Sequence, residues 1–315
     1  MPKYVVTGGA GFIGSATVRE LLQEADAEVV AIDNLLSGKR ANLAEVLERI
    51  SLVVADIRDY DTVLKHARGA DVVYHLAAIP SVPRSISDPV PSHDVNVNGT
   101  FSVFRAAADA KARRVVYAAS SSAYGDTDVL PKVETMRPLP KSLYAAQKLM
   151  GEYYAQVFQS CFGLETVSLR YFNVYGPRQD PNSPYSGVIS VFMKSLLTGK
   201  APTIFGDGQQ TRDFTYVEDV AKLNAIAGRE PSAAGKLLNA GNGNRYTLNE
   251  VWETLQRIAG VPLAAKYAEA RAGDVKDSQA DITAIREALP YHPRFELEDG
   301  LRRTFEWYRT QSAER

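Results

Sequence analysis

The sequence predicts a doubly wound α/β fold, in which a parallel sheet is covered by helices on both faces and joined to a smaller C-terminal α/β region. Short apolar runs rich in β-branched residues alternate with longer helical patterns through the first half of the chain. The runs are continuously apolar, which is typical of strands that are buried on both faces. They lie at residues 4–6, 28–32, 52–54, 71–76, 114–119 and 165–170, and a run at 236–240 is expected to return to the same sheet.

The helical patterns and the loops divide the chain into two parts. The first helix is expected at residues 15–24, because Val18, Leu21 and Leu22 recur on one face. After Tyr175 a stretch of turn-forming residues begins, and the elements become shorter. We therefore expect one domain over residues 1–175, with a returning segment at about 214–242, and a second, discontinuous domain over residues 176–315. Further helices are expected at 90–110, 144–162, 248–259, 282–289 and 300–308.

The composition is that of an ordinary globular enzyme. Of the 315 residues, 45% are apolar and 23% are charged, and the formal net charge is -1. This balance gives no electrostatic footprint for nucleic acid or for an anionic membrane. The first strand begins too early for a signal peptide to precede it, and no apolar stretch approaches the ~18 residues of a membrane span. We expect a cytoplasmic protein with neither nucleic acid nor membrane as a partner.

The chain has one cysteine, Cys161. This excludes a disulfide within one chain and any metal site built from several cysteines, so no metal is expected. Cys161 follows an apolar helical stretch, and neither a histidine nor a helix N-terminus nearby in the sequence would activate its thiol. We therefore expect Cys161 to be a packing residue.

A glycine-rich loop connects the first expected strand to the first helix. Gly8 allows a tight turn, Gly11 lets the main chain approach a pyrophosphate, and Gly14 lets the helix pack closely against the sheet. The free N–H groups at the start of the helix then face the phosphates. Nineteen residues after Gly14, the second strand ends at Asp33, whose carboxylate can bind a ribose diol and would repel a 2′-phosphate. The sequence therefore predicts a Rossmann-type domain that binds NAD rather than NADP.

Asp56 follows the third expected strand, and two interpretations of it remain open. Its carboxylate lies where an adenine contact would be expected. Alternatively, Asp56 caps a helix over residues 58–65.

Tyr144 and Lys148 are four residues apart, which places them on one face of a helix. A free tyrosine is a poor base at neutral pH, but a neighbouring ammonium and a cationic nicotinamide ring would lower its pKa. Such a pair can exchange a proton with a sugar hydroxyl. Ser120 follows the fifth strand, at the sheet edge where open α/β sheets bind ligands, and can relay the proton. We expect Ser120, Tyr144 and Lys148 to be the catalytic residues.

Together these motifs resemble the extended short-chain dehydrogenase/reductase family, and in particular its NAD-dependent epimerases and dehydratases that act on nucleotide sugars. The resemblance covers nearly the whole chain in order. It is carried by the glycine loop, Asp33-Asn34, His75-Leu76-Ala77-Ala78, Asn96, Ser120-Ser121-Ser122-Ala123-Tyr124-Gly125, Tyr144 with Lys148, Arg170-Tyr171-Phe172-Asn173, Thr211-Arg212-Asp213-Phe214 and Arg271-Ala272-Gly273-Asp274.

The resemblance implies two sets of binding residues. Those expected to bind tightly held NAD are Gly8, Gly11, Phe12, Ile13, Gly14, Asp33, Asn34, Asp56, Ile57, Leu76, Ala77, Ala78, Asn96, Tyr144, Lys148 and Tyr171. Those expected to bind a UDP-sugar are Ser81, Ser120, Ser121, Ser122, Tyr144, Asn173, Val188, Phe205, Arg212, Arg271, Asp274 and Ser278. Arg212 and Arg271 would clamp the diphosphate and Phe205 would stack on the uracil, although each arginine could instead be a surface ion-pair partner.

The residues after Ser120 indicate which reaction is expected. Related dehydratases carry an Asp-Glu pair there and related decarboxylases a glutamate, whereas this chain has Ser121 and Ser122. The resemblance therefore implies 4-epimerisation of a UDP-hexose through a 4-keto intermediate. A dehydratase, a decarboxylase, a keto-sugar reductase and a non-catalytic NAD-binding sensor are the alternatives.

Two small residues bear on the choice of sugar. Ser278 stands where related galactose-type epimerases have a gatekeeper, and a small gatekeeper admits a 2-acetamido group. The segment around Ser81 resembles that of epimerases that prefer N-acetylated sugars. We expect UDP-GlcNAc/UDP-GalNAc interconversion together with UDP-Glc/UDP-Gal, and UDP-glucuronate 4-epimerisation stays open. By the same resemblance, the helices at 90–110 and 144–162 would form a homodimer interface, unless both faces are buried within one chain.

Overall fold

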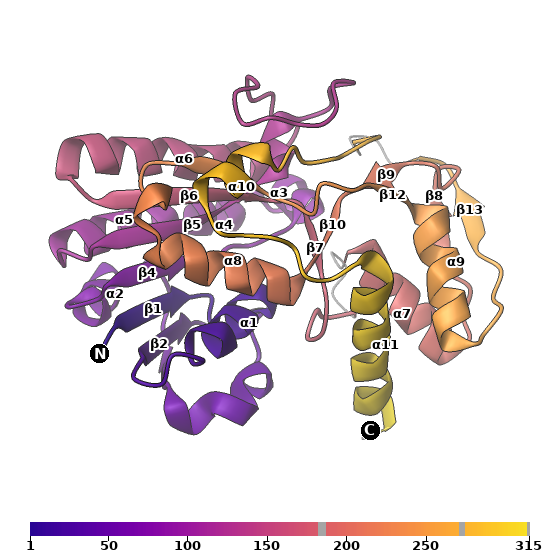
Figure 1. The fold of residues 1–315 in the computed structure, drawn as a ribbon, viewed down its shortest axis with the longest axis horizontal. Coiled ribbons are helices and arrows are strands. Elements are labelled where there is room, and N and C mark those ends of the chain that lie inside the picture. Colours follow the sequence, from indigo (N-terminus) through magenta and orange to yellow (C-terminus); the bar gives the residue numbers. More distant parts are fainter. Residues whose placement is uncertain (182–186, 271–274, 314–315) are drawn as a thin grey trace.

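The computed structural model describes residues 1–181, 187–270 and 275–313, and its largest unit is a seven-stranded parallel sheet (Figure 1). The strands are ordered β11-β6-β5-β4-β1-β2-β3, which confirms the predicted doubly wound fold. They are β1 (Lys3–Thr7), β2 (Glu28–Asp33), β3 (Ser51–Val54), β4 (Val72–His75), β5 (Arg114–Ser120), β6 (Glu165–Tyr171) and β11 (Leu237–Ala240). The run at 236–240 does return to the sheet, beside β6.

Helices surround this sheet and build the C-terminal region. They are α1 (Phe12–Leu21), α2 (Tyr60–Ala67), α3 (Val82–Ser87), α4 (Pro89–His93), α5 (Thr100–Asp109), α6 (Leu143–Phe162), α7 (Val188–Thr198), α8 (Val217–Arg229), α9 (Leu248–Ala259), α10 (Thr283–Ala288) and α11 (Leu297–Ala313). The single helix expected at 90–110 is α4 and α5 joined by a π-helical segment, Asp94–Gly99. Short 3₁₀ helices cover Arg40–Arg49, Ser121–Tyr124 and Pro231–Ala233.

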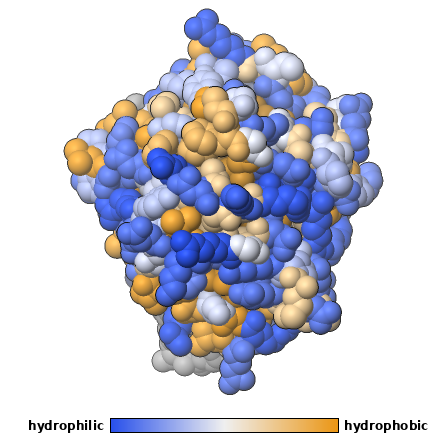
Figure 2. All heavy atoms as spheres, turned by 90° about the vertical axis from the view of Figure 1, so that its left-hand side faces the viewer, coloured by the Kyte–Doolittle hydropathy of each residue, from blue (hydrophilic) through white to orange (hydrophobic). Residues whose placement is uncertain are grey.

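The helices α3 to α6 leave large apolar side chains exposed. Figure 2 views the molecule from the left-hand side of Figure 1 and shows apolar side chains gathered in a band on that end. The exposed apolar residues of these helices are Val82, Ile86, Val90, Phe101, Leu143, Met150, Tyr153, Val157 and Phe162. Cys161 is also exposed, so the expectation that it is a packing residue is wrong. Cys161 lies in the last turn of α6, where Phe158 faces the core and Phe162 is exposed.

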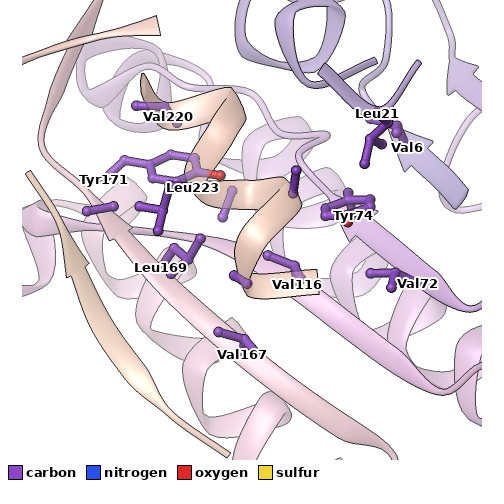
Figure 3. Packing of buried hydrophobic residues seen from close by; sticks show 14 of the residues in the cluster. Val6, Leu21, Val72, Tyr74, Val116, Val167, Leu169, Tyr171, Val220 and Leu223 are labelled. Atoms are coloured by element: carbon purple, nitrogen blue, oxygen red, sulfur yellow. The ribbon is translucent and has the colours of Figure 1, made fainter. Parts of the chain in front are cut away.

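Both faces of the sheet carry a hydrophobic core. Successive residues of a strand point to opposite faces, so Val6 packs with α1 and α8 on one side while Val5 packs with α5 and α6 on the other. Figure 3 shows the first of these cores, in which Leu223 of α8 and Leu169 of β6 lie close together. Burial on both faces explains why the strands are continuously apolar in the sequence.

The C-terminal region has its own core of side chains from α7, α9 and α11. Its sheets are small pairs: β7 (Asn173–Tyr175) with β10 (Phe214–Tyr216), β9 (Thr211–Arg212) with β12 (Tyr246–Thr247), and β8 (Thr203–Phe205) with β13 (Lys266–Ala268). The chain also returns to the main sheet a second time, since Ala280, Ile285 and Tyr291 pack in its core. We did not predict this second return.

Two buried carboxylates bind the segments of the chain that pass between the main sheet and the C-terminal region. Asp213 accepts hydrogen bonds from the main-chain N–H groups of Asn242, Gly243 and Ala280, at 2.8, 2.9 and 3.0 Å. Asp219 accepts from the N–H groups of Arg294 and Phe295, and both carboxylates have 0% exposure. Hydrogen bonds to several N–H groups compensate for the burial of each carboxylate.

Within the described residues, no helix is long and apolar enough to cross a membrane. The same residues contain no cluster of three or more histidine, cysteine or acidic side chains that could hold a metal ion.

Candidate active site

The glycine loop after β1 has the geometry that the sequence predicts. Gly8 has a φ of +71°, which favours glycine, and a Cβ on Gly8 would lie 2.7 Å from the main-chain nitrogen of Ala77. A Cβ on Gly14 would lie 2.0 Å from the carbonyl oxygen of Gly8, so α1 starts in direct contact with the loop. A Cβ on Gly11, in contrast, would meet only that carbonyl oxygen, at 3.1 Å. The loop is therefore crowded at Gly8 and Gly14 and open at Gly11.

The N-terminus of α1 fits a dinucleotide pyrophosphate. Gly11 is the N-cap and offers no side chain to the first N–H groups of the helix, which belong to Phe12, Ile13 and Gly14. Asp33 ends the neighbouring strand β2 and is only 7% exposed. Its carboxylate accepts hydrogen bonds from Ala10 N at 3.0 Å and Leu35 N at 2.8 Å, which fix its orientation beside the loop. An open helix N-terminus next to an oriented carboxylate is the donor and acceptor set that NAD requires.

Asp56 is not a helix cap. The N-cap of α2 is Asp59, whose side chain accepts from Thr62 N. Asp56 instead accepts from Asn34 Nδ2 at 3.0 Å and pairs with Arg58 at 2.9 Å. The hydrogen bonds of Arg58 hold the pKa of Asp56 at about 2, so this carboxylate is ionised. Asn34 and Asp56 thus lie together beyond β2 and β3, and their contact with an adenosine stays a prediction.

The loop after β4 is held from behind by Asn96. Asn96 accepts a hydrogen bond from Ile79 N at 2.8 Å, and its Nδ2 donates to Ile79 O at 3.1 Å and Gln147 Oε1 at 2.9 Å. Its side chain is 1% exposed. Asn96 thus holds Ile79, which directly follows the partly exposed residues Leu76, Ala77 and Ala78. Its Oδ1 accepts one hydrogen bond and can accept a second, so a contact with the cofactor stays a prediction.

Two further residues of the predicted cofactor set have buried side chains. Tyr171 points into the core between the sheet and α8, where its hydroxyl donates to Asn224 Oδ1 at 2.6 Å (Figure 3). Ile57 is packed in the core on the opposite face of the sheet. Contacts with a cofactor from either residue would therefore come from its main chain.

The three predicted catalytic residues lie together at the carboxyl end of β5. Ser120 is the last residue of β5, and its hydroxyl shares a hydrogen bond with Ser122 Oγ at 2.8 Å. The Tyr144 hydroxyl lies close enough to Ser120 for that side chain to oppose the rise of its pKa, and Lys148 follows one turn later on α6. Lys148 is 4% exposed, and its ammonium lies 4.5 Å from the centroid of the Tyr117 ring.

The expected lowering of the Tyr144 pKa does not occur in the chain alone. Burial raises the pKa of Tyr144 to about 12, and the hydrogen bond from Ser120 opposes this only in part. Burial also lowers the pKa of Lys148 to about 7, against the opposing charge of Glu152. The physical reason is that desolvation penalises both the phenolate and the ammonium. The positive nicotinamide ring that the sequence prediction invoked is therefore required to favour the phenolate.

Sequence reasoning missed several residues that position Tyr144 and Lys148. Ser85 of α3 is fully buried and accepts a hydrogen bond from Tyr144 N at 3.1 Å. Tyr117 donates to Lys148 O at 3.1 Å. A Cβ on Gly151 would lie 2.2 Å from the Tyr117 ring, so the glycine makes room for that contact. Ser85 and Gly151 lie in the printed sequence near motif residues, but their partners are distant along the chain.

The predicted sugar-binding serines have different environments. Ser121 and Ser122 begin the 3₁₀ helix after β5 and are partly exposed beside Ser120. Ser81 is 3% exposed and caps α3 by accepting from Arg84 N at 3.0 Å. Its hydroxyl therefore already serves the helix, and a contact with an acetamido group stays a prediction.

The remaining predicted substrate residues come from the C-terminal region. Asn173 Nδ2 donates to Asp213 O at 3.3 Å, and Arg212 Nη1 donates to the carbonyl oxygens of Thr211 and Lys276. Ser278 N donates to Thr211 O at 3.1 Å, which places Ser278 beside the strand of Arg212. Phe205 ends β8 and Val188 begins α7, both partly exposed. Arg271 and Asp274 lie outside the described residues.

The chain matches the family model described as the NAD dependent epimerase/dehydratase family over residues 4–241. UDP-glucose 4-epimerase of Mycolicibacterium smegmatis is 39% identical over 312 residues, which cover 98% of this chain and 99% of that protein.

Two solved structures are similar over the same extent. The structure of UDP-N-acetylglucosamine 4-epimerase from Methanobrevibacter ruminantium M1, in complex with UDP-N-acetylmuramic acid, has a TM-score of 0.94 and 38% identity, covering 98% of this chain and 99% of that one. UDP-glucuronic acid 4-epimerase from Bacillus cereus, in complex with UDP-glucuronic acid and NAD, has a TM-score of 0.91 and 33% identity with the same coverage.

Proposed function

Because the chain belongs to the NAD-dependent epimerase/dehydratase family, we propose that it interconverts the C4 epimers of a UDP-hexose through a 4-keto intermediate. The substrates we propose are UDP-GlcNAc/UDP-GalNAc and UDP-Glc/UDP-Gal. The observation that carries the proposal is the group of Ser120, Tyr144 and Lys148 at the end of β5, with Ser122 rather than a carboxylate hydrogen bonded to Ser120. Without an acid or base at this point, nothing beside Ser120 would drive elimination from a neighbouring carbon.

The mechanism follows from what each side chain can do. When bound, NAD supplies a hydride acceptor at its nicotinamide ring and the positive charge of that ring. Tyr144 takes the proton of the sugar C4 hydroxyl as the C4 hydride leaves, and Ser120 bridges Tyr144 and the sugar oxygen. The 4-keto sugar then turns about its diphosphate link, the hydride returns to its other face, and Tyr144 returns the proton. No net proton or electron is gained, so the reaction is an isomerisation.

The described members of the two sets of binding residues come from two parts of the chain. The glycine loop, Asp33 and the loop held by Asn96 are at the carboxyl edge of the main sheet, the same edge at which β5 ends in Ser120. Arg212 and Ser278 are joined through Thr211 in the C-terminal region. A sugar diphosphate held by Arg212 could turn its sugar at the sheet edge while the nucleotide stays in the C-terminal region.

One alternative substrate is favoured by a specific finding. The chain is about as similar to the Bacillus cereus UDP-glucuronic acid 4-epimerase as to several glucose-type epimerases. A small residue at Ser278 would be compatible with either sugar series. We therefore keep UDP-glucuronate 4-epimerisation as the second candidate, and the cytoplasmic location stays a prediction from the sequence.

We also propose that the protein acts as a homodimer. The exposed apolar side chains of α5 and α6, such as Phe101, Tyr153 and Val157, are 43%, 47% and 49% exposed. Packing the same two helices of a second copy against them would remove this surface from water. The alternative in which both helix faces are buried within one chain is not what the structure has.

The experiment that tests the function separates chemistry from binding. The wild-type enzyme is incubated with UDP-Glc, UDP-GlcNAc and UDP-GlcA in turn, and the C4 epimer of each is measured by NMR. Tyr144→Phe should lower kcat by at least about 100-fold, the usual size of a general acid–base contribution, while it still binds NAD. A Tyr144→Phe variant that kept full turnover would show that the mechanism is wrong. Tyr4→Phe, at the amino end of β1, removes a hydroxyl that donates to Glu24; it is the matched control and should keep wild-type kcat.

A further inference from the structure

The catalytic face of α6 continues for one turn beyond Lys148. Tyr144, Lys148 and Glu152 are spaced by four residues, so they lie on one face of the helix. Glu152 is 3% exposed, as deeply buried as Lys148 at 4%. A carboxylate in that position is costly unless it is paired, and the mechanism above gives it no task.

Glu152 is paired with Arg170 in a two-point ion pair. Arg170 Nε donates to Glu152 Oε1 at 2.9 Å, and Arg170 Nη2 donates to Oε2 at 2.7 Å. Arg170 lies on β6, where it is paired in register with Ala119, and its side chain is 1% exposed. A planar guanidinium that donates to both carboxylate oxygens fixes the position of the Glu152 side chain.

The pair is fixed on its far side by an aromatic ring. The Arg170 guanidinium lies 4.5 Å from the centroid of the Tyr124 ring, and the Tyr124 hydroxyl donates to Asn239 Oδ1 at 2.6 Å. Tyr124 belongs to the 3₁₀ helix that begins directly after Ser120. The ion pair therefore connects α6, β6 and the segment after Ser120.

The groups around the Lys148 ammonium come from four elements. Tyr144 and Glu152 are on α6, Tyr117 is on β5, His75 is on β4, and Arg170 on β6 lies behind Glu152. Burial raises the pKa of both tyrosines and lowers the pKa of His75 to about 3, so these three groups are neutral at pH 7. Among the described residues, Glu152 is the anion whose charge acts on Lys148.

We propose that Glu152, held in place by Arg170, is a positioning residue that favours the protonated form of Lys148 on the face of α6 that also carries Tyr144. The buried ammonium has no solvent around it and rests on the Tyr117 ring, so a fixed negative charge one turn away is what offsets its desolvation. The role of this charge in turnover rests on the proposed function, whereas the charge state of Lys148 does not.

The direct test measures the Lys148 ammonium by NMR. The holoenzyme is prepared with ¹³Cε-labelled lysine, the Lys148 signal is assigned with a Lys148→Arg variant, and the signal is followed through a pH titration. Glu152→Gln removes the charge and keeps one of the two oxygens that accept from Arg170, so the pKa of Lys148 should fall by about one unit. Glu152→Asp keeps the charge and should restore most of the wild-type value.

A control and a second variant complete the titration. Glu298 of α11 forms exposed ion pairs with Arg257 and Arg302. Glu298→Gln removes this carboxylate and should leave the Lys148 signal unchanged. If Glu152→Gln alone does not fold, the double variant Glu152→Gln/Arg170→Gln leaves no unpaired buried charge. The pKa of Lys148 should then fall by less than in Glu152→Gln, because loss of the more distant Arg170 charge opposes loss of the Glu152 charge. An unchanged Lys148 pKa in folded Glu152→Gln, or in the folded double variant, would overturn the proposal.

Turnover gives an independent readout. The high-pH limb of the kcat profile should move to lower pH in Glu152→Gln by the same amount as the Lys148 titration, with KM for the UDP-sugar unchanged. A uniform loss of kcat at every pH would indicate a structural role only and would contradict the proposal. Failure of the proposed function is distinguishable, because it would be seen in Tyr144→Phe and would leave the NMR titration as it is.

Discussion

The glycine loop and the joint between the two parts of the molecule are positioned by different kinds of contact. In the loop, main chain touches main chain, because Gly8 and Gly14 have no side chains to keep Ala77 and the loop apart. At the joint, the carboxylate of Asp213 gathers N–H groups from two separate crossings of the chain. The first kind of contact is marked in the sequence by the glycines themselves. The second depends on partners that only the fold brings together.

The largest effect is expected when one methyl group is added to the glycine loop. In Gly14→Ala the new Cβ would come within 2.0 Å of the Gly8 carbonyl oxygen, and a main-chain atom cannot rotate away. We expect a loss of about 3 kcal/mol or more in the free energy of unfolding, together with loss of NAD binding. Chemical unfolding and NAD titration measure both.

The control for Gly14→Ala is a glycine that is constrained by its backbone alone. Gly69 has a φ of +72°, and a Cβ there would meet no atom within 4 Å. Gly69→Ala should therefore cost only about 1 kcal/mol through backbone strain and leave NAD binding intact. Equal losses in the two variants would mean that contact within the loop is not what makes Gly14 necessary.

The same contrast explains how much the sequence could predict. Every expected strand of the main sheet is present, because burial on both faces leaves a local record in each apolar run. The grouping of Ser120, Tyr144 and Lys148 was also predictable, since each follows a strand or repeats on a helix. The second return of the chain at Ala280 was not, because it is fixed by Asp213, 67 residues away. The role of Ser85 was not predictable for the same reason, because Ser85 is 59 residues from its partner Tyr144.

Each of the two regions also contains a buried titratable side chain, and the two side chains change the stability in opposite directions as the pH falls. In the sheet, burial lowers the pKa of His75 to about 3, and its ring nitrogens lie 2.8 Å from Thr7 Oγ1 and 3.0 Å from Thr100 Oγ1. The unfolded chain takes up a proton on this residue below about pH 6.5, and the folded chain does not. Stability from His75 is therefore lost as the pH falls, by about 2 kcal/mol at pH 5.

At the joint, burial raises the pKa of Asp213 to about 6 in spite of its three N–H partners. Between about pH 4 and pH 6 the folded chain holds a proton there that the unfolded chain does not. Stability from Asp213 is therefore gained as the pH falls, by about 1.3 kcal/mol at pH 5, and is lost as the pH rises through 6.

Unfolding of His75→Asn and Asp213→Asn at pH 7 and pH 5 tests these opposite signs. The deficit of His75→Asn relative to wild type should shrink at pH 5, because the wild type loses stability that the variant cannot lose. The deficit of Asp213→Asn should grow at pH 5, because the wild type gains stability that the variant cannot gain. Deficits that move in the same direction would contradict the assignment for at least one of the two residues.

The smallest effects on stability are expected from substitutions at two helix N-termini, one of which is capped by a side chain while the other is not. Helix α9 is closed by a capping box, in which Thr247 Oγ1 accepts from Glu250 N at 3.0 Å and Glu250 Oε2 accepts from Thr247 N at 2.7 Å. Helix α1 begins at Gly11, which has no side chain to offer its first N–H groups. The cap of α9 stabilises the C-terminal region. The uncapped N-terminus of α1 leaves its N–H groups free to bind an anion.

Removing the cap of α9 and adding a cap to α1 should separate the effect of a cap on stability from its effect on cofactor binding. Thr247→Ala removes the cap and should lower the free energy of unfolding by about 1 kcal/mol with no change in NAD affinity. Gly11→Ser introduces a capping hydroxyl at a residue whose φ of -74° suits serine, so stability should change by less than about 0.5 kcal/mol. NAD affinity should nevertheless fall at least about tenfold, because the hydroxyl would take the N–H groups and the space that the pyrophosphate needs. Wild-type NAD affinity in Gly11→Ser would mean that the pyrophosphate does not lie at this helix end.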